Sequence, residues 1–311
     1  MWQPEPGWTP LRPGGGASTA GLWRAEHGGV AAVVKRLQAP RAGDQGVLSD
    51  PTHAGYWRRE AEVALEPSVI DGPGLVPPEY LRVDEDDEGV TLWAVEVVAE
   101  PPPALLVARA LGRFAAAAHR EVPWAARRTL LDRLSMAESR GGWPTLARTP
   151  VADLSEHLWS RRRRWLAEYA AAPAGRLHGD AVPANFPGTR GQDVVAVDWQ
   201  GYGVGPVGTD LGYYALSTRE DFEVLLDAYL LGIAEARPNQ DTGVDTVDPV
   251  CVRVAATVMC VYSAFSRAEW ALARVAPGEG ALHGKFGHPS VAPYLRALQR
   301  HLPQIEALVD A

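Results

Sequence analysis

Two amino acids are unusually scarce in this chain of 311 residues, which contains only two lysines and two asparagines. Arginine carries almost all of the positive charge and occurs 28 times. A lysine inside an apolar segment of such a chain is best explained by its compact point charge, which arginine does not reproduce. Lys35, in the run AAVVKRL, and Asn185, in the run RLHGDAVPANF, are therefore the first candidates for functional residues.

Cysteine and long apolar runs are also scarce. The only cysteines, Cys251 and Cys260, lie in one apolar segment and fit buried thiols in a reducing compartment better than a disulfide framework or a metal site. No uninterrupted apolar stretch of about 18 residues occurs, so we expect no membrane span. The N-terminal run MWQPEPGWTP lacks the basic and apolar regions of a signal peptide. Together these absences predict a cytoplasmic protein.

Excess positive charge is absent too, since the formal net charge is −8. A phosphate backbone calls for a basic face, so nucleic acid is not expected as a partner. The acidic balance would suit a cationic small substrate, although solubility alone favours a modest excess of this kind.

The order of sequence patterns predicts two lobes and the α+β class. A glycine-rich stretch precedes two β-rich runs, GLWRAE and VAAVVKRL, joined by a hairpin-type turn at residues 27–29. The run WRREAEVAL has helical spacing, and YLRV and VTLWAVEVV read as strands around an acidic turn. Three prolines at 101–103 then punctuate the chain, and helical spacing dominates beyond them. We therefore expect a β-rich N-lobe over residues 1–97 and a mostly helical C-lobe over 98–311.

The strongest chemical signal is the spacing of three polar residues. Asp180 and Asn185 share the segment HGDAVPAN, and Asp198 follows the apolar run DVVAV. Phosphoryl transfer from a nucleotide needs a carboxylate at the acceptor hydroxyl, oxygen ligands for Mg²⁺ and a cation on the phosphates. A loop that presents Asp180 and Asn185, a strand end that holds Asp198, and Lys35 supply these parts. The pattern predicts a kinase.

The segment LHGDAVPANF followed by VAVDWQGYGVGPVGTDLGYYAL resembles the aminoglycoside phosphotransferase and choline kinase-like family, small-molecule relatives of protein kinases. The resemblance covers about residues 11–215 and implies a bilobal protein-kinase-like fold. It implies Asp180 as the catalytic base and Asn185 and Asp198 as Mg²⁺ ligands. HGD replaces the HRD of protein kinases, and DWQ stands where they have DFG. A protein substrate is therefore not expected.

The same resemblance assigns the nucleotide site to the N-lobe. Lys35 would contact the α- and β-phosphates of ATP or another nucleoside triphosphate, steadied by Glu60 of the WRREAEVAL helix. Gly15, Gly16 and Ser18 would cover the phosphates through backbone N–H groups, because glycine permits close approach.

Two further polar residues have structural roles in this interpretation. His178 is expected to form hydrogen bonds within the catalytic loop and not to act as a catalyst. Asp210, in the run TDLG, is expected to tie the loop down from a helix start.

The acceptor pocket is expected between the catalytic loop and the C-terminal helices. Core packing or ordinary surface is the commoner role for aromatic and acidic residues, but the candidates to line the pocket are Trp199, Tyr202, Tyr213, Glu269 and Trp270. Such linings suit amines among other ligands. We therefore predict ATP- and Mg²⁺-dependent phosphorylation of a hydroxyl on a small molecule, with an amino sugar, an aminoglycoside-like antibiotic or an amino alcohol as the favoured acceptor.

Two other functions are compatible with parts of the sequence. The run GVGPVG at 203–208 matches a dinucleotide-binding pattern, but no strand with an acidic residue follows it at the required distance. A pseudokinase would bind a nucleotide without turnover, but it would usually lack one of the residues that are all present here.

Overall fold

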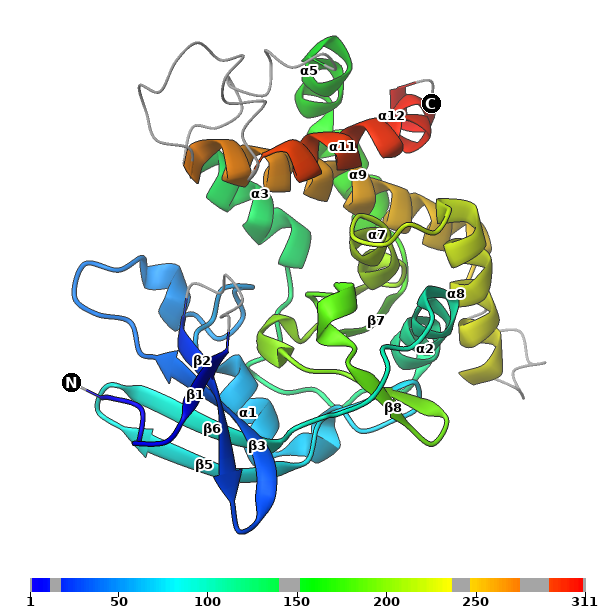
Figure 1. The fold of residues 1–311 in the computed structure, drawn as a ribbon. Helices are drawn as coiled ribbons and strands as arrows, with labels where there is room; N and C mark the ends of the chain where they lie inside the picture. Colours follow the sequence, from blue (N-terminus) through cyan, green and yellow to red (C-terminus); the bar gives the residue numbers. More distant parts are fainter. Residues whose placement is uncertain (1, 12–17, 140–151, 237–246, 275–290, 310–311) are drawn as a thin grey trace.

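The computed structural model describes residues 2–11, 18–139, 152–236, 247–274 and 291–309. The chain forms a β-rich N-terminal lobe and a larger, mostly helical lobe, which lie at the lower left and the upper right of Figure 1. The expected α+β class and two-lobed architecture are confirmed.

The N-lobe is built on a five-stranded antiparallel sheet. Its strands follow the order β1 (Thr9–Leu11), β2 (Thr19–His27), β3 (Val30–Gln38), β6 (Gly89–Val95) and β5 (Tyr80–Asp86). Gly28 and Gly29 join β2 to β3 with φ angles of 59° and 82°, which glycine adopts without strain. The expected hairpin is confirmed, and it places Lys35 in the central strand of the sheet.

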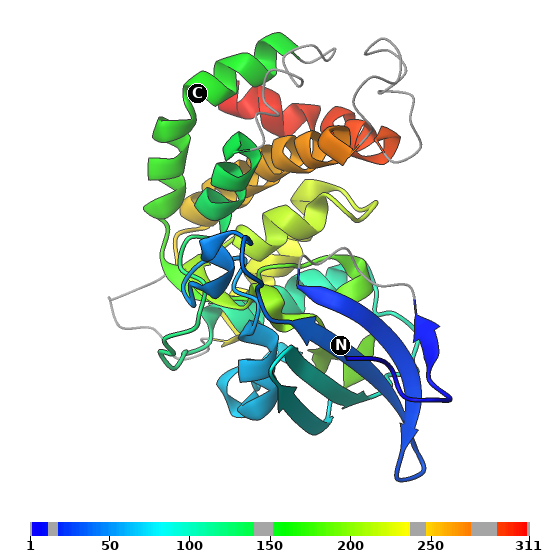
Figure 2. The same ribbon diagram turned by 90° about the vertical axis from the view of Figure 1, so that its left-hand side faces the viewer.

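Helix α1 (Arg59–Leu65) covers one face of this sheet, as Figure 2 shows from the side. Ala61 and Ala64 of the helix form a small apolar core with Leu37 of β3 and with Val90 and Leu92 of β6. The small alanine side chains let the helix approach the sheet closely, which brings Glu60 next to β3.

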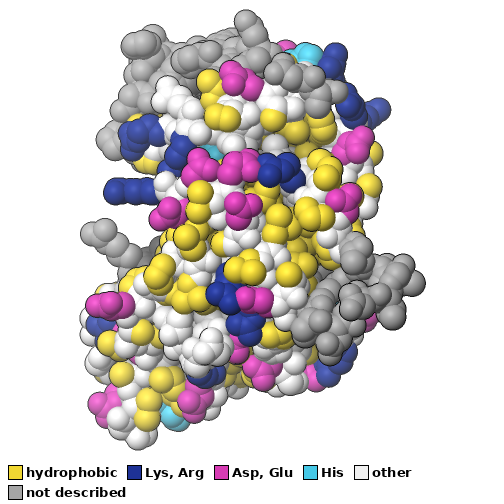
Figure 3. Space-filling model, turned by 90° about the vertical axis from the view of Figure 1, so that its right-hand side faces the viewer, with side chains coloured by type: hydrophobic (Ala, Val, Ile, Leu, Met, Phe, Trp, Pro, Cys, Tyr) yellow, Lys and Arg dark blue, Asp and Glu magenta, His cyan; other side chains and the backbone are white. Residues whose placement is uncertain are grey.

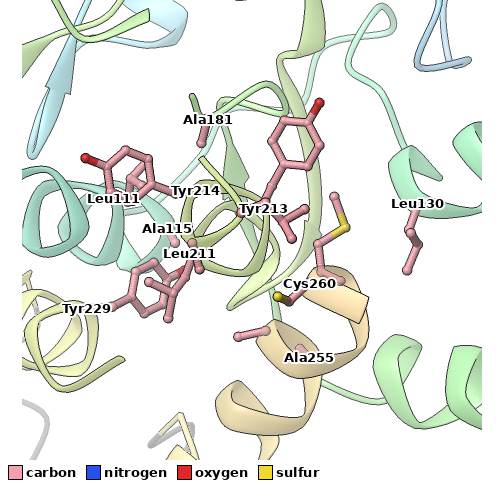
Figure 4. Packing of buried hydrophobic residues seen from close by; sticks show 14 of the residues in the cluster. Leu111, Ala115, Leu130, Ala181, Leu211, Tyr213, Tyr214, Tyr229, Ala255 and Cys260 are labelled. Carbon is pink, nitrogen blue, oxygen red and sulfur yellow. The ribbon is translucent and has the colours of Figure 1, made fainter. Parts of the chain in front are cut away.

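Nine helices make up most of the described C-lobe. They are α2 (Ala104–Ala116), α3 (Thr129–Ser139), α5 (Ala152–Ser160), α6 (Arg162–Ala170), α7 (Thr209–Ala215), α8 (Phe222–Ala236), α9 (Pro249–Arg274), α11 (Ala292–Arg300) and α12 (Leu302–Val309). Apolar side chains from these helices form one large buried cluster. Figure 4 shows part of it, with Tyr214 and Tyr229 on one side of α7 and Tyr213 on the other.

Two further small sheets contain the remaining strands. β7 (Ala174–Leu177) pairs antiparallel with β10 (Gly203–Pro206), and β9 (Asp193–Val195) lies between β8 (Gly188–Arg190) and β4 (Leu75–Val76). β4 precedes residue 97 in the chain and yet pairs with a strand of the C-lobe. The strands fix both ends of the segment that contains Asp180 and Asn185.

The glycine pattern at 203–208 is not a dinucleotide-binding turn. Its first four residues are the strand β10, and its last residue, Gly208, precedes α7 with a φ of 108°. A dinucleotide fold would need this pattern to follow a parallel strand directly. A dinucleotide-binding oxidoreductase, the function that such a pattern would indicate, is therefore not supported.

Helix α9 is the central helix of the C-lobe. Its segment Pro249–Ala268 is long and apolar enough to cross a membrane by length and composition, but 67% of the apolar window is buried within the protein. Helices α3, α6, α7, α11 and α12 all contact α9. We therefore interpret its apolar surface as core packing.

Candidate active site

The catalytic-loop candidate begins directly after β7, at His178, Gly179 and Asp180. Gly179 has a φ of 79°, and a Cβ there would lie 1.9 Å from the carbonyl oxygen of Gly201. Only glycine satisfies both the backbone angle and the close approach. The loop is thus pressed against the segment that follows Asp198.

His178 and Asp210 hold the backbone of this loop. The Asp210 carboxylate accepts hydrogen bonds from the backbone N–H groups of His178 (2.6 Å) and Gly179 (2.9 Å). Nδ1 of His178 accepts from the Asp180 N–H at 3.3 Å, so its Nε2 carries the proton and donates to Val197 O at 2.9 Å. Both residues therefore have the structural contacts expected of them, and Asp210 ties the loop down from the first turn of α7, as predicted.

Asp180 and Asn185 lie side by side, as their spacing predicts. The Asn185 side-chain amide donates to the backbone oxygen of Asp180 (2.9 Å) and to its Oδ2 (3.2 Å). Asp180 is half-exposed, with 35% of its side chain accessible. A carboxylate that is both oriented and open to solvent is what a base for an acceptor hydroxyl requires.

Lys35 joins the two lobes through a pair of carboxylates. Its Nζ lies 2.5 Å from Glu60 Oε2 and 2.6 Å from Asp198 Oδ1, with only 10% of the lysine side chain exposed. Burial alone would lower the pKa of Lys35, but the two carboxylates outweigh it and raise that pKa. Glu60 is the partner that the family resemblance implies for Lys35, whereas Glu62, on the same helix, pairs with Arg58.

Asp198 sits in a tight turn after β9. It is the one non-glycine residue with positive φ (62°) in the described chain, a conformation that aspartate tolerates better than most residues. Burial would raise its pKa, but the Lys35 ammonium outweighs this and holds the pKa of Asp198 below its ordinary value. The carboxylate is therefore ionised and available to a cation at neutral pH.

These oxygen atoms fit a magnesium ion. Asn185 donates through its amide nitrogen, which leaves the amide oxygen for a cation, and Asp198 keeps a second carboxylate oxygen besides the one that faces Lys35. Mg²⁺ in nucleotide sites is held by one or two such protein ligands together with phosphate oxygens. Among the residues that the structure describes, no group of three His, Cys, Asp or Glu side chains is arranged to hold a metal ion by itself.

Of the residues predicted to cover the phosphates, the structure describes Ser18. Ser18 is buried (4% exposed), and its hydroxyl accepts a hydrogen bond from Gln200 Nε2 at 2.7 Å. Gln200 follows Asp198 by two residues, so this contact joins Ser18, just before β2, to the turn that contains Asp198. Gly15 and Gly16 lie outside the described residues.

The predicted acceptor-site residues have different outcomes. Trp199 and Tyr202 are fully buried, and Trp199 packs between Phe114 and His178. They belong to the core, so the prediction that they line the pocket is wrong in this structure. Tyr213 does lie near the catalytic loop, while the side chains of Glu269 and Trp270 lie outside the described part of the chain.

Sequence reasoning missed Arg133 of α3. Its Nη2 donates to the backbone oxygen of Gly179 and lies 3.7 Å from Asp180 Oδ1, and its guanidinium lies 3.9 Å from the centre of the Tyr213 ring. One arginine among 28 carried no local signal, because only the fold brings α3 to the loop. Arg133 places a positive charge beside the candidate base.

Arg59 was also missed. It is fully buried and donates to five backbone oxygens, those of Pro51, His53, Ala54, Trp124 and Gln200. The long linker between β3 and α1 thus wraps around the guanidinium, and Arg59 connects α1 to the turn after Asp198.

The geometry agrees with comparisons to known proteins. A model of the phosphotransferase enzyme family matches residues 57–241, more than half of the chain. No curated protein sequence matches it significantly.

Solved structures with the same fold include small-molecule kinases. A choline kinase from Cryptosporidium parvum Iowa II is 11% identical with a TM-score of 0.56, covering 97% of this chain and 90% of its own. An aminoglycoside phosphotransferase from Alicyclobacillus acidocaldarius is 14% identical with a TM-score of 0.52, covering 96% and 92%. The GDP complex of aminoglycoside 2'-phosphotransferase-IIIa is 11% identical with a TM-score of 0.54, covering 94% and 91%. At these identities the likeness concerns the fold.

Proposed function

The chain belongs to the phosphotransferase enzyme family, and from this premise we propose that it transfers the γ-phosphoryl group of ATP or another nucleoside triphosphate to a hydroxyl of a small molecule. The observation that carries the proposal is the linkage of two residue pairs. Lys35 contacts Asp198, Asn185 contacts Asp180, and the backbone oxygen of Asn185 accepts a hydrogen bond from the N–H of Val197, the residue before Asp198. A reducing, cytoplasmic setting is part of the proposal and fits the two free cysteines.

Each residue has a distinct task in this reaction. Lys35 would bind the phosphates, with Glu60 holding its ammonium in place. Asn185 and Asp198 would hold Mg²⁺, which supplies charge neutralisation at the transferred phosphoryl group when bound. Asp180 would orient the acceptor hydroxyl and accept its proton as the oxygen attacks the γ-phosphorus.

The acceptor class is the finer part of the proposal. The neighbours include a choline kinase and an aminoglycoside phosphotransferase, in line with a small hydroxyl-bearing acceptor. The sequence favours an amine-bearing acceptor such as an amino sugar or an amino alcohol. Against this, Arg133 places a positive charge 3.7 Å from Asp180.

A coupled assay of ADP and GDP release tests the proposal. We expect Mg²⁺-dependent binding of ATP or GTP and nucleoside diphosphate release that rises on addition of a hydroxyl acceptor. The acceptor panel should contain amino sugars, aminoglycosides, amino alcohols and sugar acids. Nucleotide binding without release of ADP or GDP, either with any acceptor of the panel or in water alone, would instead indicate a pseudokinase.

A further inference from the structure

A cavity in the C-lobe lies at the C-terminal end of α7, the helix that contains Tyr213. Its volume is about 490 Å³, and it opens between the end of α7, helix α9 and helix α11. Three arginines line it, Arg267 from α9 and Arg296 and Arg300 from α11, together with Ser217 and Tyr294. Three cations around one cavity are unusual in a chain whose formal net charge is −8.

These arginines have no carboxylate partner among the described residues. Arg267 donates to the Ser217 hydroxyl at 2.9 Å, and Arg300 donates to the Leu216 backbone oxygen at 2.8 Å. By contrast, Arg253 on the same helix as Arg267 pairs with Glu223 at 2.6 Å. Acidic and basic side chains also alternate on the face of the molecule in Figure 3. The three arginines therefore line the cavity without a carboxylate counter-charge among the described residues.

Contacts through Tyr213 connect the cavity to Asp180. The guanidinium groups of Arg133 and Arg267 each lie 3.9 Å from the centre of the Tyr213 ring. Arg133 in turn lies 3.7 Å from Asp180 Oδ1. Arg133 Nη1 is buried and has no hydrogen-bond partner in the described part of the chain. Two arginine side chains, Arg133 and Arg267, therefore lie between the candidate base and the cavity, one on each side of Tyr213. The Nη1 donor of Arg133 still lacks an acceptor among the described residues.

We propose that this arginine-lined cavity binds an anionic group of the acceptor, so that the substrate of the proposed phosphotransferase is a hydroxyl-bearing acid. The inference rests on the proposed function and names its substrate class. Guanidinium groups bind carboxylates and phosphates through paired hydrogen bonds, whereas an ammonium or quaternary amine would be repelled by the same cations. Asp180 does not line the cavity itself, so the acceptor would reach from the loop, past Tyr213, to the arginines.

Anion binding can be measured independently of turnover. Calorimetric titrations would use protein saturated with Mg²⁺ and a non-hydrolysable ATP analogue, which fills the nucleotide site. The probes are inorganic phosphate, glucuronate and choline at equal ionic strength. We expect one or both anions to bind and choline not to bind. Phosphate alone would indicate a phosphorylated acceptor, and glucuronate alone would indicate a carboxylic acid.

Variants locate the binding. In Arg267→Gln, Arg296→Gln and their combination, loss of charged hydrogen bonds should weaken anion binding about 10- to 100-fold, with unchanged affinity for the nucleotide analogue. Arg253→Gln, on the same helix but paired with Glu223 outside the cavity, should bind like the wild type. Arg296 is exposed, so Arg296→Gln should leave the fold intact. Weaker anion binding in this single variant therefore cannot be attributed to a folding defect.

Acceptor activity separates this inference from the proposed function. Glucuronate differs from glucose by one carboxylate, and glucosamine differs from glucose by one ammonium group. Among these three acceptors, we expect diphosphate release to favour the acid. Preference for glucosamine, choline binding in place of the anions, or wild-type anion affinity in the double variant would overturn the inference while leaving the phosphotransferase intact. Anion binding without any release would instead overturn the proposed function alone.

Discussion

At the scale of single residues, the site depends on one lysine between two carboxylates. Glu60 and Lys35 are almost fully buried, with side chains 7% and 10% exposed. A buried charge that loses its partner costs far more than an exposed one, because the solvent cannot replace the lost interaction. Lys35 therefore has a structural part as well as its proposed part at the phosphates.

Replacing Lys35 should reduce both the stability of the fold and the affinity for the nucleotide. In Lys35→Ala, Glu60 and Asp198 face each other without the ammonium, so we expect a loss of about 3 kcal/mol in the free energy of unfolding and weaker nucleotide binding. Urea denaturation and calorimetry would measure the two effects. Lys285→Ala, which removes the other lysine, is the control. Equal nucleotide affinity in Lys35→Ala would contradict its role.

His301 gives the protein a pH-dependent stability. It is buried (3% exposed), its Nε2 lies 3.2 Å from Ala215 O, and burial lowers its pKa below the ordinary 6.5. As the pH falls below about 6.5, the unfolded chain takes up the proton before the folded protein does, so stability falls. Denaturation at pH 8 and pH 5.5 should show a smaller decrease for His301→Gln than for the wild type. The same decrease in both would refute the assignment.

At the scale of elements, two helices of the C-lobe touch through their backbones. A Cβ at Gly112 of α2 would lie 2.0 Å from Tyr229 O of α8, and a Cβ at Gly232 of α8 would lie 2.0 Å from Arg109 O of α2. The two glycines thus set the distance between α2 and α8, which run side by side in Figure 1. This contact supports the core beneath α7 and the catalytic loop.

Adding one methyl group at this contact should destabilise the lobe. Alanine is the better helix former, by about 1 kcal/mol on propensity alone, yet Gly232→Ala must push backbone atoms apart. We therefore expect a net loss of about 1–3 kcal/mol in thermal or urea unfolding. Gly46→Ala, where a Cβ would meet nothing within 4 Å, should be neutral. A stabilised Gly232→Ala protein would show that the helices separate freely.

Local patterns were sufficient to predict the elements that carry the chemistry. The hairpin at Gly28 and Gly29 and the pairing of Asp180 with Asn185 followed from short-range spacing, whereas Glu60 followed from the family resemblance. Trp199 and Tyr202 were assigned to the pocket wrongly, because the sequence does not show whether the fold will bury an aromatic side chain or leave it at a surface. Arg59 was missed because its five partners are backbone oxygens between residues 51 and 200, which only the tertiary structure brings together.

At the scale of the whole molecule, Arg59 ties the lobes into one site. Through Gln200 O (2.7 Å) and Trp124 O (2.7 Å) it binds the C-lobe, while its neighbour Glu60 binds Lys35 in the sheet. Burial lowers the pKa of Arg59 to about 10, which still leaves it charged at neutral pH. The relative position of Lys35 and Asp198 therefore depends on this one guanidinium.

A lysine cannot replace that arginine. Arg59→Lys keeps the charge but has too few donors for five carbonyl oxygens, so we expect a loss of about 3 kcal/mol in unfolding free energy and reduced turnover. Arg58→Lys is the matched control, because the adjacent Arg58 makes partly exposed ion pairs with Glu62 and Glu85. Equal stability of the two variants would show that the linker closes without Arg59.

The most direct test of the central claim compares turnover with nucleotide binding in Asp180→Ala. Release of ADP or GDP and the affinity for the Mg²⁺-nucleotide complex would be measured side by side in this variant and the wild type. If Asp180 accepts the proton of the acceptor hydroxyl, the variant binds the nucleotide with nearly unchanged affinity and loses its turnover. Turnover equal to that of the wild type would contradict the assignment of Asp180 and the mechanism built on it.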